Sequence, residues 1–268
     1  MISLDGGPPV NAPGAGRMRL TVEGPVATLT FNQPPRRNAV DLRFVQDFAS
    51  AALDIESNPS IRVILMRADG PIFSVGGDIE DMTNAGTHAQ RHLLEMAAMF
   101  HVAVERIQKS GAALVVALGG MAAGGGFSLV VGADLVVASK SAQLTSAYLK
   151  SGLTPDGGAT WFLPRLVGRQ QAFRILALNP VLSAEEALGM GLVTLVVDDD
   201  SLDAEACAIA DVLADIPGEA LSTLLHQLRA STHNGLADQL DLEASDIARL
   251  AGAPAVQSLL RAFLARSK

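Results

Sequence analysis

A glycine-rich segment between two apolar runs, residues 112–133, constrains the fold of this chain more than any other stretch. The first run, 112–118, is short, continuous and rich in alanine and valine, which predicts a strand buried on both faces. Two glycines end this strand, and three more, at 124–126, precede a second apolar run at 127–131 that predicts a buried helix. Three glycines at a helix start are costly in backbone entropy. They indicate either a ligand that approaches bare N–H groups at the helix N-terminus or unusually tight packing of helix on strand.

Composition narrows the cellular setting and the class of partner. With 268 residues, 49% of them apolar, the chain is long enough for one α/β unit with a large core and an appendage. Cys207 is the one cysteine, so no intrachain disulfide forms, which suits a reducing, cytoplasmic compartment. A net charge of −8 without a basic tract argues against nucleic acid or a membrane surface as the partner, and no apolar run is long enough to cross a membrane.

The chain divides into three parts. Residues 1–16 are rich in Gly, Pro and Asn and lack the basic and apolar regions of a signal peptide, which predicts a disordered leader. In residues 17–200 short strands alternate with helices, an α/β pattern that predicts right-handed crossovers. Residues 201–268 predict a helical C-terminal subdomain. Its expected helices cover 202–213, 218–230, 236–250 and 255–265.

Apolar periodicity and turn residues mark individual elements of the core. The expected strands cover residues 18–22, 26–31, 61–66, 112–118 and 192–197. A helix over 42–53 follows Asp41 as its N-cap, and a long helix covers 88–108. Ser183 and Glu186 are typical of a capping box that opens a short helix.

Four motifs in a fixed order identify a family. They are FSVGGDI at 73–79, GGMAAGGGFSL at 119–129, LTSAYLKSGLTPDGGATWFLPRLVG at 144–168 and SAEEALGMGLVTLVV at 183–197. Each motif alone is a weak signal, but together they resemble the crotonase superfamily of enoyl-CoA hydratases and isomerases over residues 18–267. The resemblance implies a crotonase-like (ClpP/crotonase) α/β spiral of ββα units with a C-terminal helical subdomain.

The same resemblance implies an acyl-CoA thioester as substrate and no cofactor beyond its CoA moiety. Two backbone N–H groups of these enzymes polarise the thioester carbonyl, and by position in the motifs these donors are Gly77 and Gly125. Removing a proton beside a thioester creates an enolate oxygen, which preorganised donors stabilise by ~3–4 kcal/mol each. The residues expected to contact CoA are Arg36, Arg37, Ala39, Val75, Asp78 and Ile79.

Some of these CoA-binding candidates also fit plainer roles. Two arginines in a loop, here Arg36 and Arg37, are often only solvated. Asp78 either orients the neighbouring loop or caps a helix that begins at Ile79.

The proton-transfer group decides the reaction. Hydratases of this superfamily use two glutamates, and the corresponding positions here hold Ser128 and Tyr148. Asp156 lies in the segment where members that shift double bonds carry an aspartate base, and one carboxylate suffices for an allylic proton shift. Asp156 also fits a turn residue or the cap of a helix at 159–166. Tyr148 alternatively packs or orients the substrate, and Ser128 lines the pocket or bonds back to its own helix.

The histidines do not suggest a metal site. His88, His92 and His101 fall in one expected helix without metal-ligand spacing or carboxylate companions. His226 and His233 fit surface or structural roles. We therefore expect no metal.

The C-terminal helices carry more apolar surface than the sheet can bury. The resemblance implies that this region packs homotrimers, or hexamers built as dimers of trimers, and covers the acyl pocket. Phe263 and Arg266 match residues that help to bind CoA in the superfamily.

Together these features predict an enoyl-CoA isomerase that stabilises a thioester enolate and moves a proton through Asp156. The alternative within this enzyme class is a hydratase of fatty-acid or aromatic-acid degradation, which uses Asp156 and a water held by Tyr148 or Ser128 to hydrate a 2-enoyl-CoA. The loss of both glutamates leaves a third alternative, a degenerate acyl-CoA-binding protein without turnover.

Overall fold

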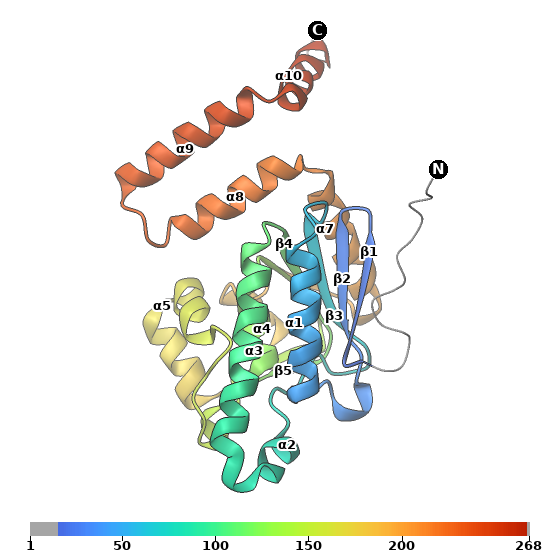
Figure 1. Ribbon diagram of the computed structural model, residues 1–268, viewed down its shortest axis with the longest axis vertical. Helices are drawn as coiled ribbons and strands as arrows, with labels where there is room; N and C mark the ends of the chain where they lie inside the picture. The colour runs from blue at the N-terminus through green and yellow to red at the C-terminus, as the bar shows by residue number, and fades with distance from the viewer. Residues whose placement is uncertain (1–15, 267–268) are drawn as a thin grey trace.

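The computed structural model describes residues 16–266, which form an α/β fold around a six-stranded sheet (Figure 1). In spatial order its strands are β1 (Met18–Glu23), β2 (Val26–Phe31), β3 (Val63–Ala68), β4 (Ala113–Leu118), β6 (Leu135–Ser139) and β9 (Leu195–Val197). β1 and β2 pair as an antiparallel hairpin, and the other neighbours are parallel. The predicted α/β class is confirmed. The leader predicted at 1–16 lies outside the described residues except for Gly16.

A second sheet follows directly from the end of β4. Its three short strands are β5 (Met121–Ala123), β7 (Gln143–Thr145) and β8 (Leu182–Ser183), in that spatial order. Single bridges join Val40 to Gly77 and Ser74 to Ala122. The second bridge holds the loop 73–79 against β5, so two motifs that are far apart in the sequence lie side by side, and the first joins the same loop to the segment before α1.

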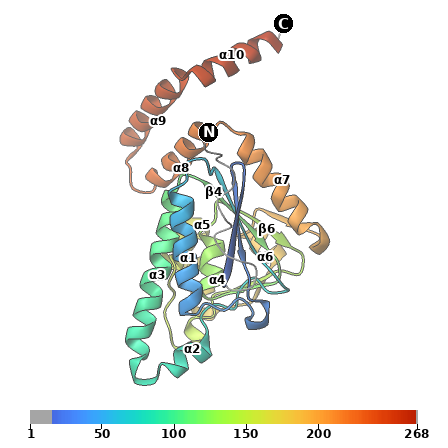
Figure 2. The same ribbon diagram turned by 45° about the vertical axis from the view of Figure 1, so that its right-hand side comes forward.

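Helices cover both faces of the large sheet, which explains the continuous apolar run in β4. Val116 packs toward α1 (Leu42–Glu56) and α3 (Ala89–Lys109), whereas its neighbour Val115 packs toward α7 (Leu202–Asp215). Figure 2 shows α1 and α3 on one side of the sheet and α7 on the other. The alternation follows from the two-residue period of a strand.

Capping signals are confirmed at two helix starts. The carboxylate of Asp41 accepts a hydrogen bond of 2.8 Å from the N–H of Phe44 and so caps α1. Ser183 and Glu186 form the predicted capping box of α6 (Ala184–Gly189).

The bounds of two predicted strands are wrong, because burial and strand pairing do not coincide. The strand expected at 61–66 covers Val63–Ala68, and the strand expected at 192–197 begins at Leu195. Ile61 and Leu192 are only 5% and 3% exposed, but they lie in loops before the paired residues. An apolar run in the sequence thus predicts correctly which residues are buried, but it predicts only approximately which residues pair with a neighbouring strand.

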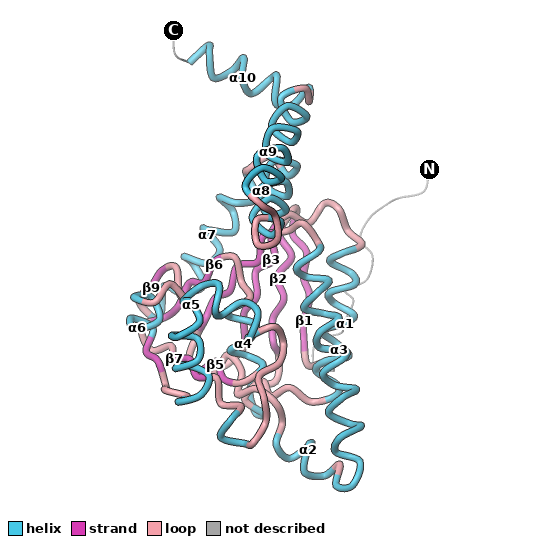
Figure 3. The backbone as a smooth tube through the Cα atoms, turned by 90° about the vertical axis from the view of Figure 1, so that its left-hand side faces the viewer, coloured by secondary structure: helices cyan, strands magenta, loops and turns pink. Residues whose placement is uncertain are grey.

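The C-terminal helices contact the core to very different degrees. α7 packs on the sheet through small residues such as Ala206 and Ala210, and α8 (Gly218–Ala230) lies across one end of the core. Beyond α8, α9 (Leu236–Ala251) and α10 (Pro254–Arg266) extend away from the sheet (Figures 1 and 3). Residues 201–268 therefore include α7 in the core layers, α8 at one end of the core, and an arm that consists of α9 and α10. None of the helices within residues 16–266 combines the length and the apolar character that spanning a lipid bilayer requires.

Candidate active site

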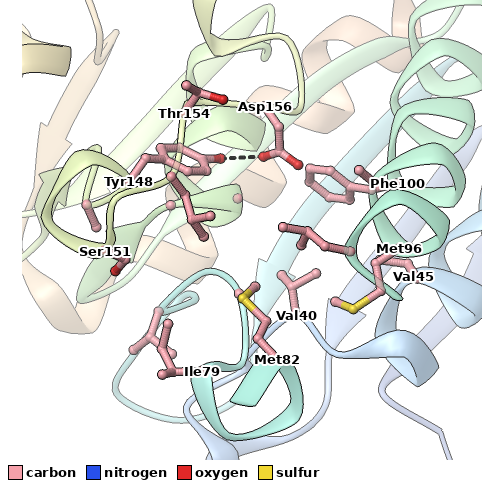
Figure 4. Close-up of a pocket in the computed structure, with 18 residues that line it drawn as sticks. Val40, Val45, Ile79, Met82, Met96, Phe100, Tyr148, Ser151, Thr154 and Asp156 are labelled. Atoms are coloured by element: carbon pink, nitrogen blue, oxygen red, sulfur yellow. Dashed lines mark hydrogen bonds between the residues drawn. The ribbon is translucent and has the colours of Figure 1, made fainter. Parts of the chain in front are cut away.

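An apolar cavity of about 360 Å³ lies between α2 (Ile79–Asn84), α3 and the loops that follow β5 and β7 (Figure 4). Apolar side chains form most of its wall, including Met82 from α2 and Phe100 from α3. The polar side chains among the lining residues are those of Tyr148, Ser151, Thr154 and Asp156. Four residues expected at the catalytic centre line this one cavity: Gly77, Gly125, Tyr148 and Asp156.

The two glycine motifs touch backbone to backbone beside the cavity. A Cβ on Gly76 would lie 2.9 Å from Cα of Gly124 and 2.8 Å from the carbonyl oxygen of Ala123, closer than side chains pack. Gly76 and Gly124 also have φ angles of 81° and 52°, in the left-handed region that favours glycine. A Cβ on Gly126 would lie 2.7 Å from Cβ of Ser74. Tight packing therefore accounts for these three glycines.

Gly125 differs from its neighbours. A Cβ at this position would meet Phe100 and Val40 at 3.6 Å, an ordinary van der Waals distance. Packing therefore does not require a glycine here, whereas a ligand that enters the cavity does require the space. Packing thus explains the outer two glycines of the triple, and the approach of a ligand stays a prediction for the middle one.

The N–H groups of Gly77 and Gly125 donate no hydrogen bond to any described residue. Gly77 lies in a loop, and Gly125 is the first residue of α4 (Gly125–Val131), where a helix offers no internal acceptor. Each motif therefore contributes one residue with an unpaired donor to the border of the same cavity.

Tyr148 and Asp156 in the cavity wall form a hydrogen-bonded cluster with Ser128, which is buried behind Tyr148 and is not among the residues that line this cavity. The Tyr148 hydroxyl donates to Oδ1 of Asp156 at 2.7 Å, a bond drawn in Figure 4, and lies 2.8 Å from Oγ of Ser128. Because the phenol proton goes to the carboxylate, the Ser128 hydroxyl is the donor in the second bond. The carbonyl oxygen of Gly124 lies 3.3 Å from the same Oγ and competes for its single proton, and the shorter contact to the phenol is the stronger bond.

Burial, together with the negative charge of Asp156, raises the pKa of the Tyr148 phenol well above its ordinary value. The phenol therefore keeps its proton at neutral pH and remains a hydrogen-bond donor. Its bond occupies Oδ1 of Asp156 and leaves lone pairs on Oδ2 for another partner. The cluster thus presents one carboxylate, held by a neutral phenol, at the edge of an apolar space.

Asp156 combines a turn with a place in the cavity wall. Its carbonyl oxygen accepts the N–H of Ala159 at 3.1 Å, and Gly157 and Gly158 continue the turn with φ angles of 59° and 86°. The side chain does not cap α5 (Ala159–Leu178), whose N-cap is Gly158. The capping alternative is wrong because the carboxylate bonds to Tyr148 instead. α5 also runs past its predicted end, through a kink at Gly168.

The expectation that the helix histidines lack carboxylate companions is wrong. Nε2 of His101 lies 3.6 Å from Oδ2 of Asp156, and Nε2 of His92 lies 2.7 Å from Oδ2 of Asp81. His88 precedes α3 in a short 3-10 turn. The partners come from other parts of the chain, so spacing along the helix gave no sign of them.

His101 is the residue at this site that sequence reasoning missed. Its Nε2 accepts a hydrogen bond of 3.1 Å from the N–H of Gly157. Because an N–H only donates, Nε2 carries no proton and the neutral ring holds its proton on Nδ1. His101 thus ties α3 to the turn that carries Asp156.

Arg36 and Asp78, both expected near CoA, form an ion pair beside the cavity. The Asp78 carboxylate also accepts the N–H of Asp81 at 3.1 Å and caps α2, so the predicted cap is confirmed. Burial raises the pKa of Asp78, but hydrogen bonds from Arg36 and from backbone N–H groups outweigh this effect and hold the pKa below its ordinary value. Arg36 therefore ties its loop to α2 and is more than a solvated charge.

The remaining CoA candidates lie in two groups. Val75 and Ile79 line the cavity, and the N–H of Val75 donates to the carbonyl oxygen of Arg37, which follows Arg36 on the exposed loop. Ala39 is buried under this loop. Phe263 lies on α10, at the opposite end of the molecule from α2 (Figure 1), and the side chain of Arg266 lies outside the described part.

Comparison with known proteins supports one family. Residues 21–268 match the model of the family described as enoyl-CoA hydratase/isomerase. The chain is 36% identical to the 1,2-epoxyphenylacetyl-CoA isomerase of Escherichia coli K12, over 91% of this chain and 94% of that protein. It is 26% identical to 4-chlorobenzoyl coenzyme A dehalogenase-2 of Arthrobacter, over 91% and 88%.

A solved structure agrees with the fold. The crystal structure of an enoyl-CoA hydratase from Polaromonas sp. JS666 superposes with a TM-score of 0.88 at 28% identity, and the match covers 94% of this chain and 98% of that one. With the motif order, the sheet topology and the cavity described above, this chain belongs to the enoyl-CoA hydratase/isomerase family of the crotonase superfamily.

Proposed function

We propose that this acyl-CoA enzyme is an enoyl-CoA isomerase in which Asp156 carries the proton. The observation that supports this most directly is that Asp156 holds the only carboxylate among the described residues that line the cavity. The two positions of the hydratase glutamates hold Ser128 and Tyr148, and both bond into the same cluster as Asp156. One carboxylate in apolar surroundings suits the transfer of a proton between two carbons.

The proposed reaction needs one base and one oxyanion site. Asp156 takes a proton from the carbon beside the thioester carbonyl of a 3-enoyl-CoA, and the electron pair of the broken C–H bond moves into the carbonyl. The N–H groups of Gly77 and Gly125 then stabilise the enolate oxygen. Protonated Asp156 returns the proton to the γ-carbon while the carbonyl re-forms, which gives the 2-enoyl-CoA. No proton is gained or lost overall.

The acyl group is proposed to contain a ring. The two relatives described above are named for 1,2-epoxyphenylacetyl-CoA and 4-chlorobenzoyl coenzyme A, both of which carry a six-membered carbon ring. The cavity offers an aromatic face from Phe100 and adaptable thioether side chains from Met82 and Met96, which suit a flat apolar group. The CoA moiety is proposed to run past Val75 and Ile79 toward the positive charges of Arg36 and Arg37.

Mass spectrometry of a panel of 2- and 3-enoyl-CoA esters, incubated with the enzyme in D2O, tests this function. We expect double-bond migration without a gain of water. Deuterium should appear at the carbon that receives the proton in those turnovers in which protonated Asp156 exchanges with solvent before it returns the proton. An ester that gains one molecule of water would indicate the hydratase alternative. Tight binding of esters without migration, hydration or exchange would indicate the degenerate acyl-CoA-binding protein.

The assembly is proposed to be a homotrimer, alone or paired into a hexamer. Support comes from the arm, where α9 has no buried residue among those described. Large apolar side chains are exposed along α9 and α10: Leu236, Leu240, Ile247, Leu259, Leu260 and Leu264. Such a surface normally packs against another chain. Light scattering coupled to size-exclusion chromatography checks the mass, and a monomer at micromolar concentration would overturn the proposal.

A further inference from the structure

Asn179 makes an unusual set of contacts behind the cavity. It follows the last turn of α5 with a left-handed φ of 52° and is only 5% exposed. Its Oδ1 accepts three hydrogen bonds from three consecutive residues: from Oγ1 of Thr145 at 2.9 Å, from Oγ of Ser146 at 2.9 Å and from the N–H of Ala147 at 2.7 Å. One oxygen therefore organises the whole segment that leads into Tyr148.

The side-chain amide of Asn179 has only one acceptable orientation. The N–H of Ala147 cannot accept a hydrogen bond, so the oxygen and not the nitrogen must face it. Nδ2 is then buried without a partner among the described residues. An unpaired buried donor costs free energy. The three hydrogen bonds that Oδ1 accepts offset this cost.

The segment held by Asn179 is strained and lies directly before the catalytic cluster. Ala147 has a φ of 59°, which is rare for a residue with a Cβ and persists where surrounding contacts enforce it. Its turn sends the next side chain, Tyr148, toward Asp156. The carbonyl oxygen of Ser146 also accepts the N–H of Gly124 at 3.2 Å, which connects the segment to the glycine triple.

We propose that Asn179 is a positioning residue that sets the left-handed turn at Ala147 and thereby aims the Tyr148 hydroxyl at Asp156. The effect of Asn179 on turnover rests on the isomerase function proposed above, whereas its effect on the hydrogen bond of the Tyr148 phenol does not depend on that function. Among the described residues that line the cavity, Ala147 is the one to which the side chain of Asn179 hydrogen-bonds, so we assign its effect on chemistry to the turn.

The first test uses the fact that Tyr148 is the only tyrosine of the chain. Enzyme labelled with ¹³C at tyrosine Cζ gives one resonance, whose shift reports the hydrogen bond of that phenol. Asn179→Gly keeps the left-handed backbone and removes the acceptor. We expect a shifted or broadened resonance in this variant. The matched control is Leu221→Ala, which creates a cavity in the separate apolar cluster between α8 and the start of β4. This control should lower the melting temperature of the enzyme but leave the tyrosine resonance unshifted.

The second test is turnover in a double-mutant cycle. Asn179→Gly should lower kcat by about 10- to 100-fold with little change in KM, because misplacing a group of the site affects chemistry more than binding. In a Tyr148→Phe background the same substitution should cost less than about 2-fold, because the positioned hydroxyl is already gone. If Asn179→Gly does not fold, Thr145→Val/Ser146→Ala removes two of the three donors and carries the same predictions at smaller amplitude.

An unchanged resonance in the folded acceptor-deleting variant would overturn the proposal, as would an equal change in the Leu221→Ala control. Additive losses of kcat in the cycle would also overturn it, because Asn179 would then act by another route. If the wild-type enzyme turns over no enoyl-CoA, the isomerase function fails while the resonance test still decides the role of Asn179.

Discussion

The phenol of Tyr148 is hydrogen-bonded to Oδ1 of Asp156 at 2.7 Å, and its oxygen lies 2.8 Å from Oγ of Ser128. The two positions that carry glutamates in hydratases of the superfamily are therefore still part of the site, but as neutral hydroxyl groups arranged around a single carboxylate. Such an arrangement favours moving one proton between two carbons over the activation of water by two carboxylates.

Asp156→Asn should lower the isomerisation rate by ~10²–10⁴-fold, the usual cost of removing a general base. The amide oxygen still accepts the Tyr148 hydroxyl, so the fold and the cluster should remain. The measurement follows double-bond migration in an enoyl-CoA, with CoA-ester binding determined separately by calorimetry. Ser128→Ala is the control, and its rate should fall far less because its hydroxyl only donates to the phenol. An asparagine variant as fast as wild type would leave Asp156 as a turn residue.

Gly125→Pro should lower turnover by ~10²–10³-fold, because it deletes one donor to the enolate oxygen. Proline is well tolerated at the first position of a helix, which is where Gly125 lies in α4, so the variant should fold. Gly125→Ala keeps the N–H and adds a methyl group that meets Phe100 and Val40 at 3.6 Å. In steady-state kinetics, the turnover of Gly125→Ala should therefore be well above that of Gly125→Pro. Equal losses in the two variants would mean that space, and not the donor, matters at this position.

Much of the fold could be predicted because its strongest signals are local. Burial on both faces dictates the uninterrupted apolar run of β4, and the caps at Asp41 and Ser183 act within one helical turn. Boundaries at Val63 and Leu195 could not be predicted, because loop residues such as Ile61 are as buried as strand residues.

Only those residues of the site that stand in a sequence motif could be predicted. Gly77, Gly125, Tyr148 and Asp156 stand in motifs, and they do line one cavity. His101 stands in no motif and reaches Gly157 only because α3 packs beside the turn, so the pair is a property of tertiary structure.

The phenol of Tyr148 should resist ionisation, because burial and the charge of Asp156 raise its pKa. The pKa of an unperturbed tyrosine is about 10. With a raised pKa in the folded state, the contribution to stability is fully present below about pH 10 and is lost as the pH rises above it, since the unfolded phenol ionises first. Absorbance of the single tyrosine at alkaline pH checks this, with Asp156→Asn as the variant in which ionisation should begin at lower pH. A tyrosinate signal at the ordinary pKa in folded enzyme would contradict it.

The Arg36–Asp78 pair should make stability sensitive to acid. The folded-state pKa of Asp78 is lowered from 3.8, so its contribution is present above that value and is lost as the pH falls through the lower folded-state pKa. Arg36→Gln removes the main side-chain donor to this carboxylate. Urea unfolding at pH 7 and at pH 3 should show a smaller difference for the variant than for wild type. Because Arg36 is well exposed, the effect should shrink at high salt.

His101→Leu should lower kcat by about 10-fold or more, because it leaves the N–H of Gly157 without its acceptor and loosens the turn that carries Asp156. His101→Gln offers an amide oxygen to the same N–H and should retain more activity than the leucine variant. The direct measurement is hydrogen exchange at the Gly157 amide, which should be faster in His101→Leu than in wild type or His101→Gln. If leucine leaves both kcat and the exchange rate unchanged, the contact between α3 and the turn does not hold Asp156 in place. If exchange is faster while kcat stays at the wild-type value, the contact is structural and the position of Asp156 is set by Tyr148 alone.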